Sequence, residues 1–159
     1  MRCEPVRDVW HRGRYYPIRQ AIPEGDALDL FFADGVILVE GPAERILVPH
    51  FVRSRSEYEF LGRCYVTWLE IGGSHAHRLK SLIEHLGLNT LIITDIDAKN
   101  PAGSSVPPAR GAGLKARNET LKAWVPKNES LDTLLDTKEV DLALRTAVGT
   151  ASAWPISNR

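Results

Sequence analysis

The sequence predicts an α/β fold with a parallel sheet flanked by helices. Residues 35–40 and 90–95 are unbroken, apolar and rich in β-branched side chains, which is typical of strands buried on both faces; residues 64–71 are a third strand candidate. The segments between them carry apolar residues at helical spacing. Strands that alternate with helices in this way indicate βαβ units, with parallel strands and right-handed crossovers.

Length and composition limit what kind of protein this is. The chain has 159 residues, 43% of them hydrophobic and 25% charged, as in an ordinary globular domain. Twenty basic residues balance twenty acidic ones, so the total charge favours neither a nucleic acid nor a membrane as partner. Apolar runs are too short to span a bilayer, the N-terminus lacks a signal peptide, and the two cysteines form no metal-binding or disulfide framework. We therefore expect a cytoplasmic protein without a membrane partner.

The first 30 residues differ from the rest of the chain. They combine aromatic, β-branched and arginine residues, which favours a short N-terminal β hairpin turning at Arg12-Gly13, or the tail of a preceding domain, over residues 1–30. We expect residues 31–149 to form the main domain. Residues 150–159 show no periodicity and are expected to be a tail.

A helix is predicted directly after the first strand. Gly41 ends the strand, and Pro42 suits the first helical position because its missing amide hydrogen has no partner there. Pro49 interrupts the apolar stripe and predicts a kink or a short helix, which resumes near residues 57–61. The stripe consists of Ala43, Ile46, Leu47 and Phe51, widened by Val48 and Val52.

The second strand candidate ends at Gly72-Gly73-Ser74. Ser74 can cap a helix over residues 75–86, and Gly87 suits its C-terminal cap. The third strand follows this helix. Because three buried strands then alternate with two helices, we expect the first and third strands to share one sheet.

The pattern changes after Asp97. Residues 101–113 are rich in Gly, Pro, Ser and Ala and indicate a long loop, which inside a compact domain is usually functional or disordered. Short helices are predicted over residues 118–124, 130–135 and 137–148, which gives the chain a helical C-terminal part.

Acidic side chains follow two of the predicted strands. Glu40 ends the first strand, and Asp95 and Asp97 lie at and just past the end of the third. Ligands of open parallel sheets bind at the carboxyl ends of strands, and Glu44, in the first turn of the next helix, can face the same edge. Four carboxylates in one crevice repel each other unless a cation neutralises them, and their oxygen atoms suit Mg²⁺ or Mn²⁺.

Each of these acids also has an ordinary structural interpretation. Glu40 alone could be a solvated surface residue, and Glu44 could close a capping box on Gly41. The functional interpretation gains strength because Glu-Gly-Pro-Ala-Glu and Asp-x-Asp each follow a buried strand. The sequence shows no Ser-His-Asp or Cys-His arrangement that would support catalysis by a protein nucleophile.

The two acidic motifs and their surroundings resemble those of a known family. Residues 36–44 and 92–97 resemble a Toprim domain, the catalytic module of topoisomerases, bacterial primases and some nucleases. The closer resemblance, from residue 31 onward, is to the nuclease part of the OLD (overcoming lysogenization defect) family. It extends to the Gly-Gly-x-His segment at residues 72–75 and to a downstream motif made of Asn118, Leu121, Trp124 and Pro126.

The resemblance implies a metal-dependent DNA endonuclease. It implies that two divalent ions activate water and stabilise the leaving oxygen, with Glu40, Asp95 and Asp97 as catalytic residues. It also implies that the metal ligands are Glu40, Glu44, Asp95 and Asp97. The family's nucleases use a further lysine near the C-terminus, which matches no residue here, and Lys99 stands where topoisomerase-type domains often have a third acid.

Family chains usually carry an ATPase domain ahead of the Toprim domain. This sequence has no P-loop motif, so it looks like the Toprim piece of a larger protein. The oligomeric state is left open, with a homodimer among the states considered.

A basic segment is hidden by the neutral total charge. Residues 99–127 contain six basic residues and one acidic residue, a net charge of +5. They could contact DNA phosphates, or form a solvated loop that offsets the acids after Asn128. The DNA contacts that we expect are Lys99, Arg110, Lys115 and Arg117.

Three further side chains have competing interpretations. His75 could orient a phosphate or assist proton transfer, but it lies beside a helix start, where a capping-region role is the ordinary interpretation. Trp68 and Trp124 are expected to be core residues rather than platforms for nucleic-acid bases.

Three other functions are open to this sequence. One is a non-catalytic Toprim-like module for nucleic-acid binding or dimerisation. Another is a haloacid-dehalogenase-type phosphatase, which also places Asp-x-Asp after a strand; here Lys99 replaces the usual Thr or Val, and no adjacent acidic pair follows. The third is a receiver-like phosphorylation switch, for which the paired acids after an N-terminal strand are missing.

Overall fold

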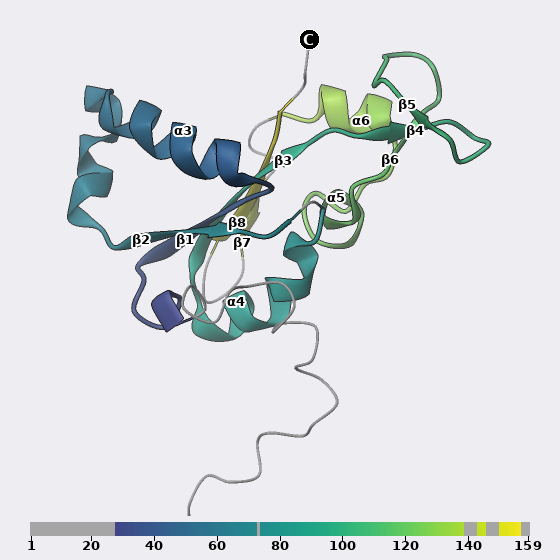
Figure 1. Ribbon diagram of the computed structural model, residues 1–159. Helices are drawn as coiled ribbons and strands as arrows, with labels where there is room; N and C mark the ends of the chain where they lie inside the picture. The colour runs from purple at the N-terminus through teal and green to yellow at the C-terminus, as the bar shows by residue number, and fades with distance from the viewer. Residues whose placement is uncertain (1–27, 73, 139–142, 146–149, 157–159) are drawn as a thin grey trace, which may run out of the picture.

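The computed structural model describes residues 28–72, 74–138, 143–145 and 150–156 (Figure 1). The hairpin expected at Arg12-Gly13 lies outside these residues. Within them the predicted α/β class is confirmed, because helices flank a sheet whose central strands run parallel. No helix in the described ranges is long and apolar enough to cross a membrane.

A five-stranded sheet forms the centre of the described part of the chain. Its strands are β1 (Gly35–Val39), β2 (Val66–Glu70), β3 (Asn89–Asp95), β7 (Ala143–Arg145) and β8 (Thr150–Ile156). Their order is β2-β1-β3-β8-β7; only β7 runs antiparallel to its neighbour. Val39 pairs with Glu70 on one side and Ile93 on the other, so β1, β2 and β3 reach the same edge.

The C-terminal part differs from the sequence prediction. The helix expected over residues 137–148 is wrong for residues 143–145, which form β7, while residues 139–142 and 146–149 lie outside the described residues. Within the expected tail, residues 150–156 form β8, which pairs with β3 over six residues. Without β8, the backbone of the buried strand β3 would lack hydrogen-bond partners along one side. The residue pattern of the tail could not predict this strand, because the need for it arises in β3.

Helix α3 (Pro42–Arg53) contacts β1 and β2, and the 3-10 segment η1 (Ser56–Arg63) follows it. Pro42 occupies the first turn, as predicted. Of the two alternatives predicted at Pro49, the short helix is wrong, because α3 continues past Pro49 to Arg53, and the kink stays a prediction. No residue of α3 is buried, so the carbonyl that Pro49 deprives of an amide partner can be hydrated. Ile46 is 70% exposed and Phe51 58%, which leaves an apolar surface on this helix.

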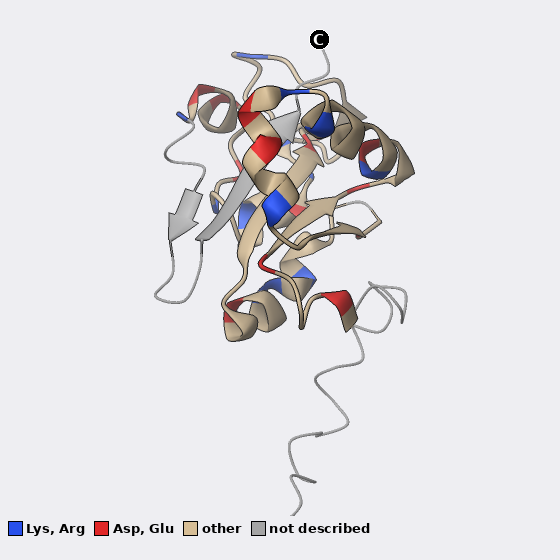
Figure 2. Ribbon diagram, turned by 90° about the vertical axis from the view of Figure 1, so that its left-hand side faces the viewer, with Lys and Arg blue, Asp and Glu red and all other residues tan. Residues whose placement is uncertain are grey.

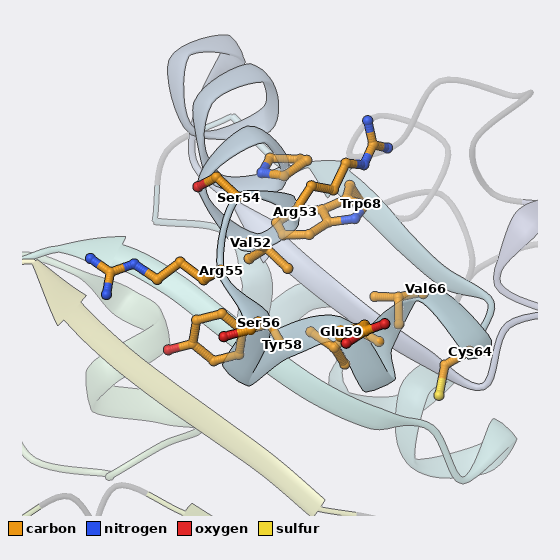
Figure 3. A pocket seen from close by; sticks show the side chains of 13 residues that line it. Val52, Arg53, Ser54, Arg55, Ser56, Tyr58, Glu59, Cys64, Val66 and Trp68 are labelled. Atoms are coloured by element: carbon orange, nitrogen blue, oxygen red, sulfur yellow. The ribbon is translucent and has the colours of Figure 1, made fainter.

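A cavity of about 680 Å³ lies between α3, η1 and the outer strand β2 (Figure 3). Its lining includes Val52, Tyr58 and Leu61, together with Val66 and the half-buried Trp68. None of the four acids predicted to bind metal lines this cavity. Trp68 borders this cavity and also packs against a core cluster of Ile37, Val39 and Ile93, which agrees with its predicted core role.

A second helical layer lies on the sheet face opposite α3 (Figures 1 and 2). It consists of the 3-10 turn η2 (Ala76–Leu79) and helix α4 (Lys80–Leu86). Ser74 does not cap it as predicted, since η2 begins after His75 and has no side-chain cap. The predicted cap at Gly87 is confirmed: it has a left-handed φ of 69°.

A small antiparallel sheet forms around the loop predicted over residues 101–113, with one strand inside the loop and one on either side of it. Its strands, in the order β5-β4-β6, are β4 (Ala98–Lys99), β5 (Ser105–Val106) and β6 (Lys115–Ala116). A tight reversal at Gly103, with φ 88°, joins β4 to β5. The small sheet extends beyond the end of β3 and is followed by helices α5 (Glu119–Ala123) and α6 (Leu131–Asp136) (Figure 1).

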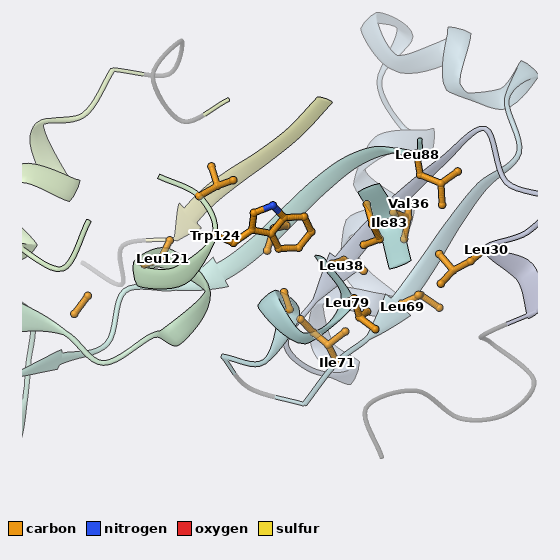
Figure 4. Packing of buried hydrophobic residues seen from close by; sticks show 14 of the residues in the cluster. Leu30, Val36, Leu38, Leu69, Ile71, Leu79, Ile83, Leu88, Leu121 and Trp124 are labelled. Carbon is orange, nitrogen blue, oxygen red and sulfur yellow. The ribbon is translucent and has the colours of Figure 1, made fainter. Parts of the chain in front are cut away.

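The main core packs the α4 side of the central sheet (Figure 4). Trp124 is 1% exposed within it, which confirms the predicted core role. A smaller core under the small sheet contains Ile96, Ala98, Leu114 and Leu131. The main core includes Leu38, Leu69, Leu79, Ile83, Ile92, Leu121 and Trp124.

Candidate metal and nucleic-acid site

The acidic edge of the sheet forms as the sequence predicts. β1 and β3 are neighbours, so Glu40, which follows β1, lies beside Asp95, the last residue of β3. The Asp95 amide donates to Glu40 Oε1 at 3.3 Å. Two acids that are 55 positions apart in the sequence are thereby brought together at the carboxyl end of the sheet.

Glu40 is held through one of its two oxygens. Glu40 Oε1 accepts hydrogen bonds from the Thr94 hydroxyl, from the Asp95 amide and, at 3.1 Å, from Asn118 Nδ2. Within the ranges that the structure describes, no hydrogen bond reaches Oε2. The carboxylate therefore has a fixed orientation with one oxygen free of hydrogen bonds from the described residues.

Glu44 makes the capping contact that the sequence allowed. Its Oε2 accepts the Gly41 amide at 3.1 Å, which ties the start of α3 to the end of β1. Glu44 also helps to raise the pKa of Asp95, so its charge acts on the same edge. The structural role of Glu44 is thus confirmed, and a metal-binding role stays a prediction.

The four acids act on one another electrostatically. Burial is the main cause that raises the pKa of Glu40; hydrogen bonds from Thr94 and the Asp95 amide oppose it, and repulsion by Asp95 and Asp97 adds to it. Burial also raises the pKa of Asp95, followed by repulsion from Glu44 and Asp97. Such an accumulation of partly buried negative charge attracts a cation.

The acids do not form a closed ligand set in this conformation. In the part of the chain that the structure describes, no three His, Cys, Asp or Glu side chains are grouped so that they could hold a metal ion. The hydrogen bonds explain part of this: Glu40 Oε1 turns toward Thr94 and Asn118, and Glu44 Oε2 toward Gly41. The four carboxylates therefore influence one another's charge without forming a ligand group in this structure. Cation binding would require their side chains to move.

Three of the four predicted DNA-contacting residues share one face of the small sheet. Lys99 pairs with Lys115 in the β4–β6 register, and the Arg117 amide donates to the Asp97 carbonyl at 2.8 Å. Ala98 is buried in the small core and Ala116 in the main core, so their neighbours along the strands point to the other face. We call Lys99, Lys115 and Arg117 the basic face. Asp97 connects this face to the acidic edge, because its carbonyl accepts the Arg117 amide.

The basic face is partly engaged by other side chains. Lys115 Nζ lies 2.8 Å from Glu129, and Arg117 donates to Ser105 Oγ at 2.9 Å. Arg110 is separate, since it donates to the side chain of Asp136 and to the Leu135 carbonyl. Blue and red segments alternate over the described ribbon, so the basic face is a local feature (Figure 2).

His75 makes a local contact. Its Nδ1 lies 2.9 Å from the Gly72 carbonyl oxygen, within the turn that precedes η2. In the described residues, no hydrogen bond joins His75 to the four acids. This contact agrees with the capping-region interpretation, and a role toward phosphate stays a prediction.

Sequence reasoning missed the roles of Asn118 and Thr94. Both are buried, and both donate to Glu40. Asn118 could be read from the sequence as part of a motif and as a residue before a helix. Its hydrogen bond to an acid 78 positions away depends on how β6 and α5 fold back over β3.

Comparisons with known proteins agree with the predicted fold. Residues 31–97 match the family model described as the TOPRIM domain of overcoming lysogenization defect protein-like proteins. Endonuclease GajA of Bacillus cereus strain HuB5-5 is 29% identical over 109 residues, which are 67% of this chain and 16% of that protein. Endonuclease GajA of strain VD045 is 36% identical over 73 residues, 45% of this chain and 12% of that protein.

No solved structure matches this chain significantly. The chain covers less than a fifth of either relative's length. The family match itself spans β1, α3, β2, α4 and β3, and it ends at Asp97, so both acidic motifs lie within it. Residues 31–97 of this chain are therefore similar to the Toprim domain of the OLD-like family.

Proposed function

We propose that this domain is the divalent-metal-dependent nuclease part of a larger DNA endonuclease. The observation that carries the proposal is the acidic edge, where Glu40 and Asp95 lie side by side within a Toprim domain. The names of the two relatives support a nuclease-type function. Their greater length supports a larger protein, in which we expect an ATPase domain and leave a homodimer open.

The donor set fits Mg²⁺ or Mn²⁺. The candidate ligands offer only carboxylate oxygens, which hard divalent cations prefer, and a cation would relieve the repulsion that raises two of their pKa values. Glu40 would bind through Oε2, with Asp95 beside it, and Glu44 and Asp97 would complete the set. Two bound ions would supply an activated water and stabilise the leaving oxygen of a phosphodiester.

The basic face would hold the DNA backbone next to this edge. Lys99 lies in β4, two residues after Asp97 and four after Asp95, so a phosphate bound at Lys99 would lie near the acidic edge. Arg117 and Lys115 would add contacts after exchanging their present partners, which are exposed and weakly held. Arg110 would have to give up its contacts with α6 to join them.

A non-catalytic Toprim module is the second candidate. It is favoured by the absence, among the described residues, of a closed group of metal ligands. The family's additional lysine also matches no residue here. By contrast, the Toprim match over both acidic motifs disfavours a haloacid-dehalogenase-type phosphatase.

Nicking of supercoiled plasmid tests the proposal. We expect nicking with Mn²⁺ or Mg²⁺, none with EDTA, and a loss of at least about 100-fold for Glu40→Ala and Asp95→Ala, because each removes a proposed metal ligand. Glu84→Gln, a surface change on α4, is the matched control and should retain full activity. Equal nicking by wild type and Asp95→Ala would refute the site. Metal-independent DNA binding without nicking would favour the non-catalytic module.

A further inference from the structure

We propose that Asn118, together with Thr94, is a positioning residue that fixes Glu40 so that only Oε2 faces the metal. This inference rests on the proposed function, because it assumes that Glu40 binds a divalent cation. It goes further by assigning a role to two residues that do not themselves bind the metal.

The orientation of the Asn118 amide is set from both ends. Asn118 is 2% exposed, and its Oδ1 accepts the amides of Thr120 at 2.9 Å and Leu121 at 3.4 Å, which caps helix α5. Since these donors require an oxygen, Nδ2 must point the other way. There it lies 3.1 Å from Glu40 Oε1 and 3.3 Å from the Asp95 carbonyl oxygen, and it also contacts Thr94 Oγ1.

The Thr94 hydroxyl completes a consistent network. It has one hydrogen, which it donates to Glu40 Oε1, so it can only accept from Asn118 Nδ2. Thr94 is 3% exposed and lies in β3, which places the hydroxyl directly beside β1. Every donor in the network has an acceptor, and the direction of each hydrogen bond follows from the others.

The consequence for Glu40 is that Oε1 is saturated. It accepts from the Thr94 hydroxyl, the Asn118 amide group and the Asp95 backbone amide, which fills the lone pairs of a carboxylate oxygen. A cation must then approach Oε2. Hydrogen bonds of this kind orient metal ligands, and their loss typically lowers metal affinity by about 10- to 100-fold.

Asn118 also connects the acidic edge to the basic face. It lies directly after Arg117 and immediately before α5, so one side chain fixes β6, α5 and Glu40 relative to one another. A cap without this second function would need only Oδ1. The use of Nδ2 on an acid of the proposed site is what distinguishes Asn118 from an ordinary helix cap.

Mn²⁺ binding measured by calorimetry on the whole chain tests the inference without relying on activity. We expect Asn118→Ser and Thr94→Val each to weaken Mn²⁺ binding by about 10-fold or more. Serine can still cap α5, so the unfolding temperature in EDTA reports separately on any structural loss. Thr94→Ser keeps the hydroxyl and should restore most of the affinity lost in Thr94→Val.

Asn128→Ser is the matched control. Asn128 accepts the amide of Ser130 at 2.9 Å, the same type of local contact that Asn118 makes with Thr120, but the structure shows no hydrogen bond from it to an acid. Its Mn²⁺ affinity should equal that of the wild type.

Two results would overturn the inference, and they differ in whether the proposed metal site also fails. If Asn118→Ser and Thr94→Val bind Mn²⁺ like the wild type while Glu40→Gln does not, the positioning role is wrong and the metal site stands. If the folded wild type binds no Mn²⁺, the proposed function fails and the positioning role fails with it.

Discussion

Glu40 and Asp95 carry charge at a cost to the folded state. Burial is the first cause that raises the pKa of each, and neighbouring carboxylates add to it. Each group therefore holds its proton more tightly in the folded protein than in the unfolded chain. The resulting stabilisation is fully present below the unfolded pKa and is lost as the pH rises through the raised folded pKa. At neutral pH without a cation, both carboxylates disfavour folding.

Removing one of these charges should stabilise the protein. In EDTA at pH 7.5, we expect Asp95→Asn and Glu40→Gln each to raise stability by about 1 kcal/mol after allowance for solvent screening, or about 2–4 °C in Tm. The gain should shrink as the pH is lowered toward 4, where the wild-type carboxyls take up protons. Thermal unfolding followed by circular dichroism measures this, with Glu84→Gln as control. A lower Tm for both variants at pH 7.5 would contradict the expectation.

The small sheet gives a segment of loop-like composition a defined basic face. Alternation along β4 and β6 buries Ala98 and Ala116, whereas Lys99 is half-buried and Lys115 and Arg117 are exposed. The glycines that led us to predict a loop over residues 101–113 lie at the turns between the short strands. Three of the six basic residues between 99 and 127 thus share one face of the small sheet.

Salt dependence separates the basic face from Arg110. We expect Lys99→Gln and Arg117→Gln each to lower the slope of log Kd against log salt by about one unit for duplex DNA, since each removes one phosphate contact. Arg110→Gln should change the slope less, because Arg110 already contacts Asp136 and Leu135. Fluorescence anisotropy in EDTA, which prevents cleavage, gives the slopes. Identical slopes for all variants would show that the DNA binds elsewhere.

At the scale of the whole molecule, β8 joins the C-terminal part of the chain to the central sheet, between β3 and β7. β8 pairs with β3 over six residues, from Thr90 to Asp95, alongside the strand that carries the acidic edge. Residues 150–156 therefore belong to the same sheet as β1. Their loss would expose one side of a buried strand to solvent.

Truncation after residue 149 should be strongly destabilising. We expect a fall in Tm of more than about 10 °C or the loss of cooperative unfolding, because β3 would lose its ladder partner on one side. Truncation after residue 156, which retains β8, is the control and should leave Tm nearly unchanged. Unchanged Tm in the shorter form would mean that residues 150–156 are a dispensable tail after all.

The α/β class, the three parallel strands, the start of α3 at Pro42, the cap at Gly87 and the shared edge of Glu40 and Asp95 could all be predicted from the sequence. These features depend on local composition and on the short-range order of strands and helices. The contrast between apolar strands and the acids that follow them is visible in a single sequence, and parallel pairing then places those acids together.

The tertiary structure alone decided the strands β7 and β8, the small sheet and the hydrogen bonds that hold Glu40. β8 forms because β3 needs a partner, and Asn118 reaches Glu40 because α5 packs against the core through Leu121 and Trp124. Such contacts join residues far apart in the chain. These contacts depend on which surfaces are still unpaired after the first elements have packed. The pattern of residues within one segment cannot show this.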